Sequence, residues 1–310
     1  MITTLAGGVG AARFLEGVVQ VVSPESVTVI VNTGDDIVLH GLAISPDLDI
    51  VTYTLAGIIE ESQGWGIRSD STNTLAMLKR LGADTWFLLG DRDLATHIRR
   101  TELLHNGATL TEIADLIRRM LGVAVHILPM SNERVTTMIT TPDDQIHFQH
   151  YLVQRRAQDP VLGVHFAGAM HARPAPGVQA ALQEAEMVLI APSNPIVRIG
   201  TILAVPGIQA ALETTSAPVV AVSPIVGGAA IKGPAAPLMQ ARGFEVSALG
   251  VAQCYAALID VLVIDTIDAE LAEPIHALGI EVVVTDTIMR GPAEKRALAQ
   301  RCIEAARSHS

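Results

Sequence analysis

The chain opens with Ile2-Thr3-Thr4-Leu5, which leads into Gly7-Gly8-Val9-Gly10, and a helical pattern continues over residues 11–22. An apolar run, a glycine turn and a helix in this order predict the first strand and helix of a sheet. Glycines let backbone N–H groups approach an anion, and a helix N-terminus adds partial positive charge. We therefore expect phosphate contacts at Gly7, Gly8 and Gly10, with tight packing of strand on helix as the alternative.

The composition is that of a folded chain with a large core. Of 310 residues, 49% are hydrophobic and 17% charged, which suits one large domain or a domain with an insertion. The net charge of -11 argues against nucleic acid as a partner. Cys254 and Cys302 lack CxxC spacing, which indicates a reducing compartment and no structural zinc. Prolines interrupt the most apolar stretch, 199–231, and no signal pattern begins the chain, so we expect a cytoplasmic protein without a membrane partner.

Short apolar runs recur along the chain and end in polar or glycine-rich turns. Such runs are typical of strands that are buried on both faces of a parallel sheet, and helical patterns separate them. The predicted fold class is α/β, with an open, mainly parallel, Rossmann-like sheet. After the first strand, the predicted strands are 27–31, 187–190, 219–222, 261–264 and 282–284, and the predicted helices are 177–185, 208–214, 251–258, 268–278 and 292–306.

The middle of the chain has a different pattern. It predicts helices at 72–81, 93–105 and 111–121, and Thr109 with Glu112 forms a capping box before the last of them. Strands are then predicted at 135–141, 146–153 and 161–166, with a hairpin turn at 142–144. We expect residues 1–310 to form one large α/β domain in which about 70–165 make a mixed α+β insertion or cap.

The segment that follows the strand 27–31 is rich in carboxylates. Residues 32–49 contain Asp35, Asp36, Asp47 and Asp49 and no Lys or Arg. Crowded carboxylates repel one another, and Mg²⁺ relieves that repulsion while it also binds a diphosphate. We expect Asp35 and Asp49 to bind Mg²⁺, with Asp36 and Asp47 behind them. The alternative is that these acids cap helices and turns, with Asp49 as the N-cap of a helix predicted at 50–61.

Two further segments contain candidate ligand-binding side chains. Trp65 stands between two glycines, where an indole can stack on a flat ring or close over the core. Residues 89–97 combine acids with Arg92 and His97. Arg92 can bind a phosphate with two hydrogen bonds, or it can pair with Asp91 or Asp93, one of which would then be an N-cap. His97 and Asp93 lie on one helix face.

Polar groups also follow two of the later buried strands. Ser193, Asn194 and Ser223 lie where a base or phosphate binds in an open α/β sheet. Lys232 lies in a glycine-rich loop, where it is either a phosphate ligand or a solvated side chain. The chain has no GxSxG, GxxxxGKS or HExxH motif. This inventory favours metal-assisted displacement on phosphorus over a covalent nucleophile.

Taken in order, these motifs resemble the 2-phospho-L-lactate transferase family of deazaflavin coenzyme biosynthesis, CofD or FbiA. The resemblance spans nearly the whole chain. It implies that the ribityl hydroxyl of the deazaflavin Fo attacks the phosphorus of a guanosine diphosphate adduct and that GMP leaves. The motifs that carry it are 7–10, 32–36, 40–42, 45–49, 64–66, 89–97, 128–131, 147–149, 192–195 and 223–225.

The resemblance also implies roles for individual residues. Asp35 and Asp49 would hold Mg²⁺ and the diphosphate, and Asp49 is also a candidate base for the hydroxyl proton. The guanosine diphosphate part would contact Gly7, Gly8, Gly10, Ser193, Asn194, Ser223 and Lys232. The deazaflavin would contact Asp47, His40, Trp65, Asp91, Arg92, His97 and Met130.

Several points stay open at this stage. The transferred acyl group can be lactyl, enolpyruvyl or glyceryl, and the loop with Gly227, Gly228 and Lys232 departs from some relatives. The apolar composition makes a homodimer plausible. The competing function is a nucleotide-sugar-binding regulatory protein of the same fold. A dinucleotide oxidoreductase fits less well, because the turn is GGxG and the second strand lacks the ribose-binding acid.

Overall fold

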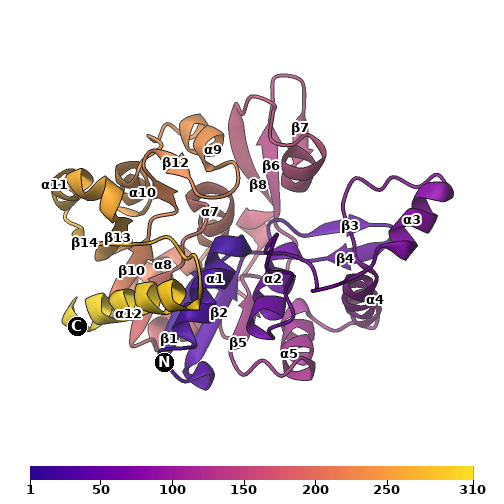
Figure 1. The fold of residues 1–310 in the computed structure, drawn as a ribbon, viewed down its shortest axis with the longest axis horizontal. Coiled ribbons are helices and arrows are strands. Elements are labelled where there is room, and N and C mark those ends of the chain that lie inside the picture. Colours follow the sequence, from indigo (N-terminus) through magenta and orange to yellow (C-terminus); the bar gives the residue numbers. More distant parts are fainter. Residues whose placement is uncertain (310) are drawn as a thin grey trace.

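A seven-stranded parallel sheet forms the centre of the computed structural model, which describes residues 1–309 (Figure 1). The strand order is β14-β13-β10-β9-β1-β2-β5, and every neighbouring pair is parallel. This arrangement confirms the predicted α/β class and the strands predicted from the apolar runs. The strands are β1 (Ile2–Ala6), β2 (Val27–Val31), β5 (His126–Pro129), β9 (Met187–Ile190), β10 (Val219–Val222), β13 (Val261–Asp265) and β14 (Glu281–Thr285).

Each central strand sends alternate side chains into two separate cores. Leu5 and Ile30 belong to one buried cluster, whereas Ile2 and Val29 belong to the other. The first cluster lies against α6 (Val178–Gln183), α8 (Ile208–Thr214), α10 (Ala248–Tyr255) and α11 (Ala272–His276). The second lies against α1 (Gly8–Val18), α2 (Pro46–Leu55), α5 (Leu110–Met120) and α12 (Pro292–His309). Burial on both faces explains why the strands read as continuous apolar runs.

The helix after the acidic segment begins earlier than predicted. We expected a helix at 50–61 with Asp49 as its N-cap, but α2 starts at Pro46 and its N-cap is Ser45. Proline suits the first turn of a helix because its missing N–H has no helical partner there. Asp47 and Asp49 therefore lie inside the first turn, where a carboxylate also interacts favourably with the helix dipole.

The three helices predicted in the middle of the chain are present as α3 (Asn73–Arg80), α4 (Asp91–His105) and α5. Thr109 and Glu112 form the predicted capping box at α5. The strand β5, which follows α5, was not predicted and forms one edge of the central sheet. The stretch of about 70–165 thus supplies a strand of the main sheet as well as smaller elements, and its description as an insertion stays a prediction.

A small antiparallel sheet follows, in the order β7-β6-β8, with β6 (Thr136–Thr140), β7 (Gln145–His147) and β8 (Gly163–Ala167). The hairpin between β6 and β7 is as predicted. The strand predicted at 146–153 is wrong beyond His147, because residues His150–Gln154 form a short π-helix, η2. Phe148 and Tyr151 are both fully buried. A spacing of three residues places two side chains on one face of a helix rather than of a strand.

The remaining elements are short. They are η1 (Pro24–Ser26), β3 (Ile37–Leu39), β4 (Leu42–Ile44), η3 (Ala169–His171), η4 (Pro195–Ile199), α7 (Gly200–Leu203), β11 (Ile225–Val226), β12 (Ala229–Ala230), α9 (Ala235–Ala241) and η5 (Thr266–Leu271). Within residues 1–309, no single helix has both the length and the hydropathy to cross a membrane; η4 and α7 meet that test only together with α8, across a bend of 84°.

The close packing of α1 on α12 gives a test of the fold. A Cβ at Gly17 would lie 2.1 Å from the carbonyl oxygen of Lys295 on α12. Gly17→Ala should therefore force the two helices apart and lower the free energy of unfolding by about 1–3 kcal/mol, measured by urea denaturation. Gly163→Ala is the matched control, since a Cβ there would meet only Thr140 at 3.9 Å. Equal stability of the two variants would contradict this packing.

Candidate functional site

A cavity of about 660 Å³ opens at the carboxyl ends of the parallel strands. Its wall includes Gly7 and Gly10 after β1, Ser193 and Asn194 after β9, and Pro224 after β10. In open α/β sheets, ligands bind at this edge. The first turn of α2, the glycine-rich loop with Lys232 and an aromatic group from the middle of the chain complete the wall. Most of the motifs singled out in the sequence thus meet at one cavity, which we call the cleft.

The glycine turn at the start of α1 packs closely against other parts of the chain. A Cβ at Gly7 or Gly8 would lie 2.8 Å and 2.7 Å, respectively, from side-chain carbons of Arg198, and a Cβ at Gly10 would lie 2.4 Å from the carbonyl oxygen of Pro192. Gly8 also has a positive φ of 74°. Glycine at these positions is therefore required by packing within the protein. This requirement leaves the predicted phosphate contacts untested.

The loop after β9 joins the glycine turn through hydrogen bonds. The backbone N–H of Gly7 donates to Ser193 Oγ over 3.2 Å, and the Ser193 hydroxyl donates to the Gly7 carbonyl. Asn194 is the N-cap of η4, because its side-chain oxygen accepts from the N–H groups of Ile196 and Val197. The sequence placed Ser193 and Asn194 at the site, and both line the cleft.

Arg198, on η4, lies among the carboxylates of the acidic segment. Its Nε donates to Asp47 Oδ2 over 3.1 Å, and its Nη2 lies 3.8 Å from Asp35 Oδ2. Asp47 also accepts from the side-chain amide of Asn32 over 2.9 Å. The side chain of Asp47 is 1% exposed and that of Asp35 is fully buried. Arg198 therefore supplies positive charge beside Asp35 and Asp47, whose segment has no Lys or Arg of its own.

Asp35 is the least satisfied group of this cluster. Neither carboxylate oxygen has a hydrogen-bond partner among residues 1–309. Burial raises the pKa of Asp35 to about 8, repulsion from Asp47 adds to the increase, and Arg198 opposes it. Because a buried carboxylate without partners is costly, this position favours either a proton or a cation beside the oxygens.

A second buried network surrounds Asp49. Arg100 on α4 donates from both terminal nitrogens to the Asp49 carboxylate, with Nη1 at 3.1 Å from Oδ2. His97 Nδ1 lies 3.7 Å from Asp49 Oδ2, and His97 Nε2 lies 3.4 Å from Asp93 Oδ1. Tyr53 donates its hydroxyl to Asp93 over 2.8 Å. Burial raises the pKa of Asp49, and Arg100 and His97 oppose that shift.

The oxygen-rich donor set of these two networks suits a hard divalent cation. Asp35 contributes two oxygens without partners, and Asp36 contributes one. Asp49, Asp93 and His97 offer ligand atoms that all lie within 4.8 Å of one another. The residues present therefore fit Mg²⁺, although Asp49 already binds Arg100. The assignment of Asp35 and Asp49 as the metal pair stays a prediction.

One wall of the cleft is aromatic. Trp65, Trp86, Phe87 and Tyr53 all line it. The Trp86 ring lies 5.5 Å from the Phe87 ring, edge to face, and 4.4 Å from the ring of His150. Only 3% of the residues of this chain are aromatic, so their concentration here marks a surface that can receive a flat ring.

Lys232 connects two loops at the mouth of the cleft. Its ammonium donates to the carbonyl oxygen of Gln63 over 2.5 Å. Burial lowers the pKa of Lys232, and the charge of Arg13 lowers it further. Arg13 and Lys232 both line the cleft, as does Arg198. The cleft therefore presents three cationic side chains together with its buried acids.

Seven of the predicted site residues do not line the cleft, namely Asp35, Gly8, Asp91, Arg92, His40, Met130 and Ser223. Asp35 lies behind the wall, beside Arg198, and the last three lie elsewhere. His40 is exposed at the turn between β3 and β4, with φ of 53°. Met130 is fully buried in the core. The Ser223 hydroxyl is turned into its own loop, where it donates to the Ile225 carbonyl over 2.9 Å. The structure does not bring these three side chains to the cavity.

The acids near the start of α4 cap helices. Asp91 accepts from the backbone N–H of Thr74 and from the Ser71 hydroxyl, and these hydrogen bonds lower its pKa. Asp91 therefore caps α3, while Asp70 accepts from the N–H of Arg92 and so caps α4. The guanidinium of Arg92 donates to a backbone carbonyl. Asp91 and Arg92 lie outside the cleft wall, whereas His97 lines it.

Sequence reasoning missed Arg100 and Arg198. Arg100 is 51 residues from Asp49, and Arg198 is 151 residues from Asp47. Neither arginine belongs to a local motif, so no spacing connects it with its partner. The sequence gives only a weak indication of these arginines. The excess of acids in residues 32–49 predicts that a cationic side chain from another segment lies beside them.

The network around Asp49 predicts an unequal effect of two neighbouring substitutions. Arg100→Gln removes the charge that balances a buried carboxylate and should lower the free energy of unfolding by about 3–5 kcal/mol. Arg99→Gln, on the same helix, removes an exposed pair with Glu102 and should have little effect. Urea denaturation of both variants measures the difference. Similar stabilities would show that Arg100 does not balance a buried charge.

Comparisons with known proteins identify the family of this chain. The family model described as 2-phospho-L-lactate transferase CofD matches residues 2–304. A phosphoenolpyruvate transferase of Kitasatospora aureofaciens is 45% identical over 286 residues, covering 90% of this chain and 89% of the relative. A 2-phospho-L-lactate transferase of Methanothermobacter thermautotrophicus is 42% identical, covering 97% of this chain and 96% of the relative.

A solved structure shares the fold. It is a Bacillus halodurans protein of the UPF0052 family, with a TM-score of 0.63 at 14% identity, covering 97% of this chain and 98% of that one. At this identity the likeness concerns the fold alone. The family model and the relatives extend over almost the whole sequence, including every segment that forms the cleft. The chain therefore belongs to the 2-phospho-L-lactate transferase (CofD) family.

Proposed function

We propose that the protein transfers a phospho-acyl group, 2-phospho-L-lactate or phosphoenolpyruvate, from a guanosine diphosphate adduct to the ribityl hydroxyl of Fo, in coenzyme F-420 biosynthesis. GMP is the leaving group. The observation that supports this most is the fully buried Asp35 at the carboxyl edge of the sheet. Among residues 1–309 its two oxygens have no hydrogen-bond partner, and Arg198 lies 3.8 Å away. Relatives named for transfer of phospholactate and of phosphoenolpyruvate support the reaction class.

Mg²⁺ is part of this proposal. Asp35 is the first ligand we assign, because its oxygens have no other partner, and Asp49 is the second. The ion would neutralise the diphosphate of the donor and so make its phosphorus easier to attack. Arg198 pairs with Asp47 and opposes the rise in the pKa of Asp35, which burial and Asp47 cause. A bound cation would displace the proton from Asp35.

The donor phosphates lie, in this proposal, between the glycine turn and the three cations of the cleft. Arg13, Arg198 and Lys232 line that part of the wall, and the start of α1 adds the positive end of a helix dipole. Ser193 and Asn194 hold the loop after β9 in place through their hydrogen bonds. This assignment explains why an acidic chain gathers cations at one cavity.

The acceptor lies against the aromatic wall. Trp65 and Trp86 line the cleft and present faces on which a tricyclic ring can stack. Of the acceptor contacts expected from the sequence, Asp47, Trp65 and His97 are used here. The hydroxyl oxygen of the acceptor forms a bond to phosphorus, and the bond from that phosphorus to GMP breaks. A cleft carboxylate takes the proton, and both Asp49 and Asp93 line the cavity.

The transferase assay tests the proposal directly. Purified protein is incubated with Fo, Mg²⁺ and either the lactyl or the enolpyruvyl guanosine diphosphate adduct, and GMP release is measured. Asp35→Asn should reduce turnover roughly 100-fold or more, because it removes the carboxylate that the proposal assigns to Mg²⁺. Asp143→Asn is the control, since Asp143 is exposed in the turn after β6.

Two results would contradict the proposal. If Asp35→Asn keeps wild-type turnover at saturating Mg²⁺, the metal assignment is wrong. If the wild-type protein binds the guanosine adduct but releases no GMP with any adduct and shows no optical response to Fo, it is a binding protein instead.

A further inference from the structure

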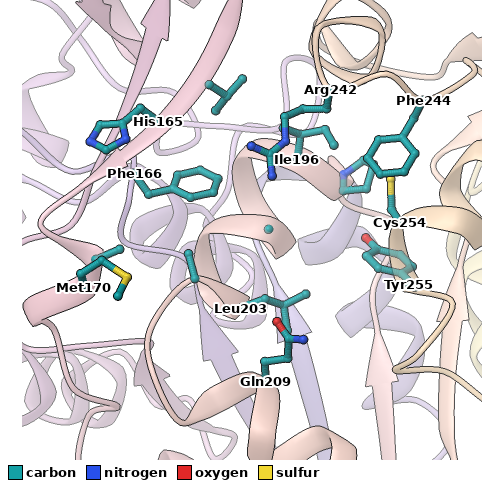
Figure 2. Close-up of a pocket in the computed structure, with 15 residues that line it drawn as sticks. His165, Phe166, Met170, Ile196, Leu203, Gln209, Arg242, Phe244, Cys254 and Tyr255 are labelled. Carbon is teal, nitrogen blue, oxygen red and sulfur yellow. The ribbon is translucent and has the colours of Figure 1, made fainter.

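A second cavity, of about 440 Å³, lies apart from the cleft and shares no lining residue with it (Figure 2). It is an open cavity lined by β8, η3, the η4–α7 segment, α8, α10 and the loop after α9. Pro195, Ile196 and Gly200 face this cavity, whereas Asn194 and Arg198 of the same segment face the cleft. The proposed transfer reaction makes no use of this second cavity.

The wall of this cavity combines apolar side chains with polar ones in nearly equal exposed area. Phe166 enters from β8, Ile196 and Leu203 from the η4–α7 segment, and Phe244 from the loop after α9 (Figure 2). Its volume lies within the range of natural small-molecule sites, which combine apolar walls with a few polar groups. The size suits one ring with a short chain attached.

Tyr255 places an unsatisfied polar group at this cavity. The residue is 1% exposed, and its hydroxyl has no hydrogen-bond partner among residues 1–309. Figure 2 shows the hydroxyl turned toward the space between Ile196 and Leu203. A buried hydroxyl without a partner is costly, and most such groups in native proteins are satisfied. The hydroxyl oxygen has almost no exposed surface, so a ligand that enters the cavity reaches it only when the side chains around it shift.

Arg242 places a positive charge at the second cavity. It follows α9 and is exposed, and its guanidinium extends over the cavity opposite Phe166 (Figure 2). Among residues 1–309, no carboxylate forms an ion pair with Arg242. His165 on β8 and Gln209 on α8 also reach the rim, but neither carries a negative charge. An unpaired guanidinium above a cavity with apolar side chains in its wall selects a planar anion with an apolar body.

We propose that this cavity is a binding site for a small carboxylate that carries an apolar ring and a second polar group. The carboxylate pairs with Arg242, the ring lies against Phe166, Ile196 and Phe244, and the second polar group bonds to the Tyr255 hydroxyl. The site goes beyond the proposed transferase reaction, and its occupancy can be measured without that reaction.

The chain contains its own reporter for this site. Cys254 lines the cavity and is partly exposed, whereas the other cysteine, Cys302, is fully buried on α12. Burial raises the pKa of Cys254 to about 12, so alkylation is slow but measurable under alkaline conditions. A ligand in the cavity should shield Cys254, and mass spectrometry of the alkylated peptide reports that shielding.

The probe is 3-(4-hydroxyphenyl)propionate, which has the carboxylate, the ring and the second polar group. Isothermal titration calorimetry should show binding to the wild-type protein, and iodoacetamide should modify Cys254 more slowly when the probe is present. Arg242→Gln should weaken the affinity roughly tenfold, because it removes a charge-assisted hydrogen bond. Tyr255→Phe should weaken it less, since it removes a neutral hydrogen bond. Lys232→Gln changes only the cleft and should leave the affinity unchanged.

Two outcomes would overturn the proposal. One is that the probe, at concentrations up to about 10 mM, produces no heat of binding and does not protect Cys254 from alkylation. A specific site of this size should bind more tightly than that. The other is binding that Lys232→Gln abolishes and Arg242→Gln does not change, because the probe would then occupy the cleft. Neither outcome depends on transferase activity, so the proposed function stands or fails separately.

Discussion

The ion pair between Arg198 and Asp47 is the interaction on which the cleft depends. It joins η4, which follows the fourth strand along the sheet, to the first turn of α2 across the glycine turn of α1. The glycines at 7 and 8 are needed because the arginine side chain lies against their Cα atoms. Removing the cation would leave Asp35 and Asp47 buried together without a compensating charge, which is among the costliest arrangements in a protein interior.

The same interaction accounts for the chemical character of the cleft. Arg198 balances Asp47 closely but lies farther from Asp35, which keeps two buried oxygens without partners. A group in this position has a strong tendency to take up a proton or a cation, and its pKa of about 8 reflects that tendency. The cavity is thus lined by cationic and acidic side chains and by an aromatic group.

Much of the fold could be predicted from the sequence because its signals are local. Continuous apolar runs mark the central strands, and Thr109 with Glu112 marks the start of α5. The sequence-based predictions were wrong where the local pattern was ambiguous. The strand β5 begins with a histidine and ends with a proline, so it lacks the composition of a buried strand. Residues 146–153 are apolar enough for a strand, but the positions that the core buries follow a helical spacing.

The candidate site was predictable in its acids and loops but not in its cations. The acidic segment, Trp65, His97, the loop at Ser193 and Lys232 all line or adjoin the cleft, as their positions after strands and turns suggested. Arg100 and Arg198 reach their partners only through the folded chain, so no spacing in the sequence reveals them. Asp91 was predicted to bind the ligand from its position in a motif, but its carboxylate caps the neighbouring helix α3.

A double-mutant cycle on Arg198 and Asp47 tests the central claim most directly. The free energy of unfolding is measured for the wild type, Arg198→Gln, Asp47→Asn and the double variant, and the coupling energy is obtained from the four values. A buried pair that organises the cleft should give a coupling energy of about 1–3 kcal/mol. Effects that add to within about 0.5 kcal/mol would show that the two side chains do not depend on each other, and would contradict this account of the cleft.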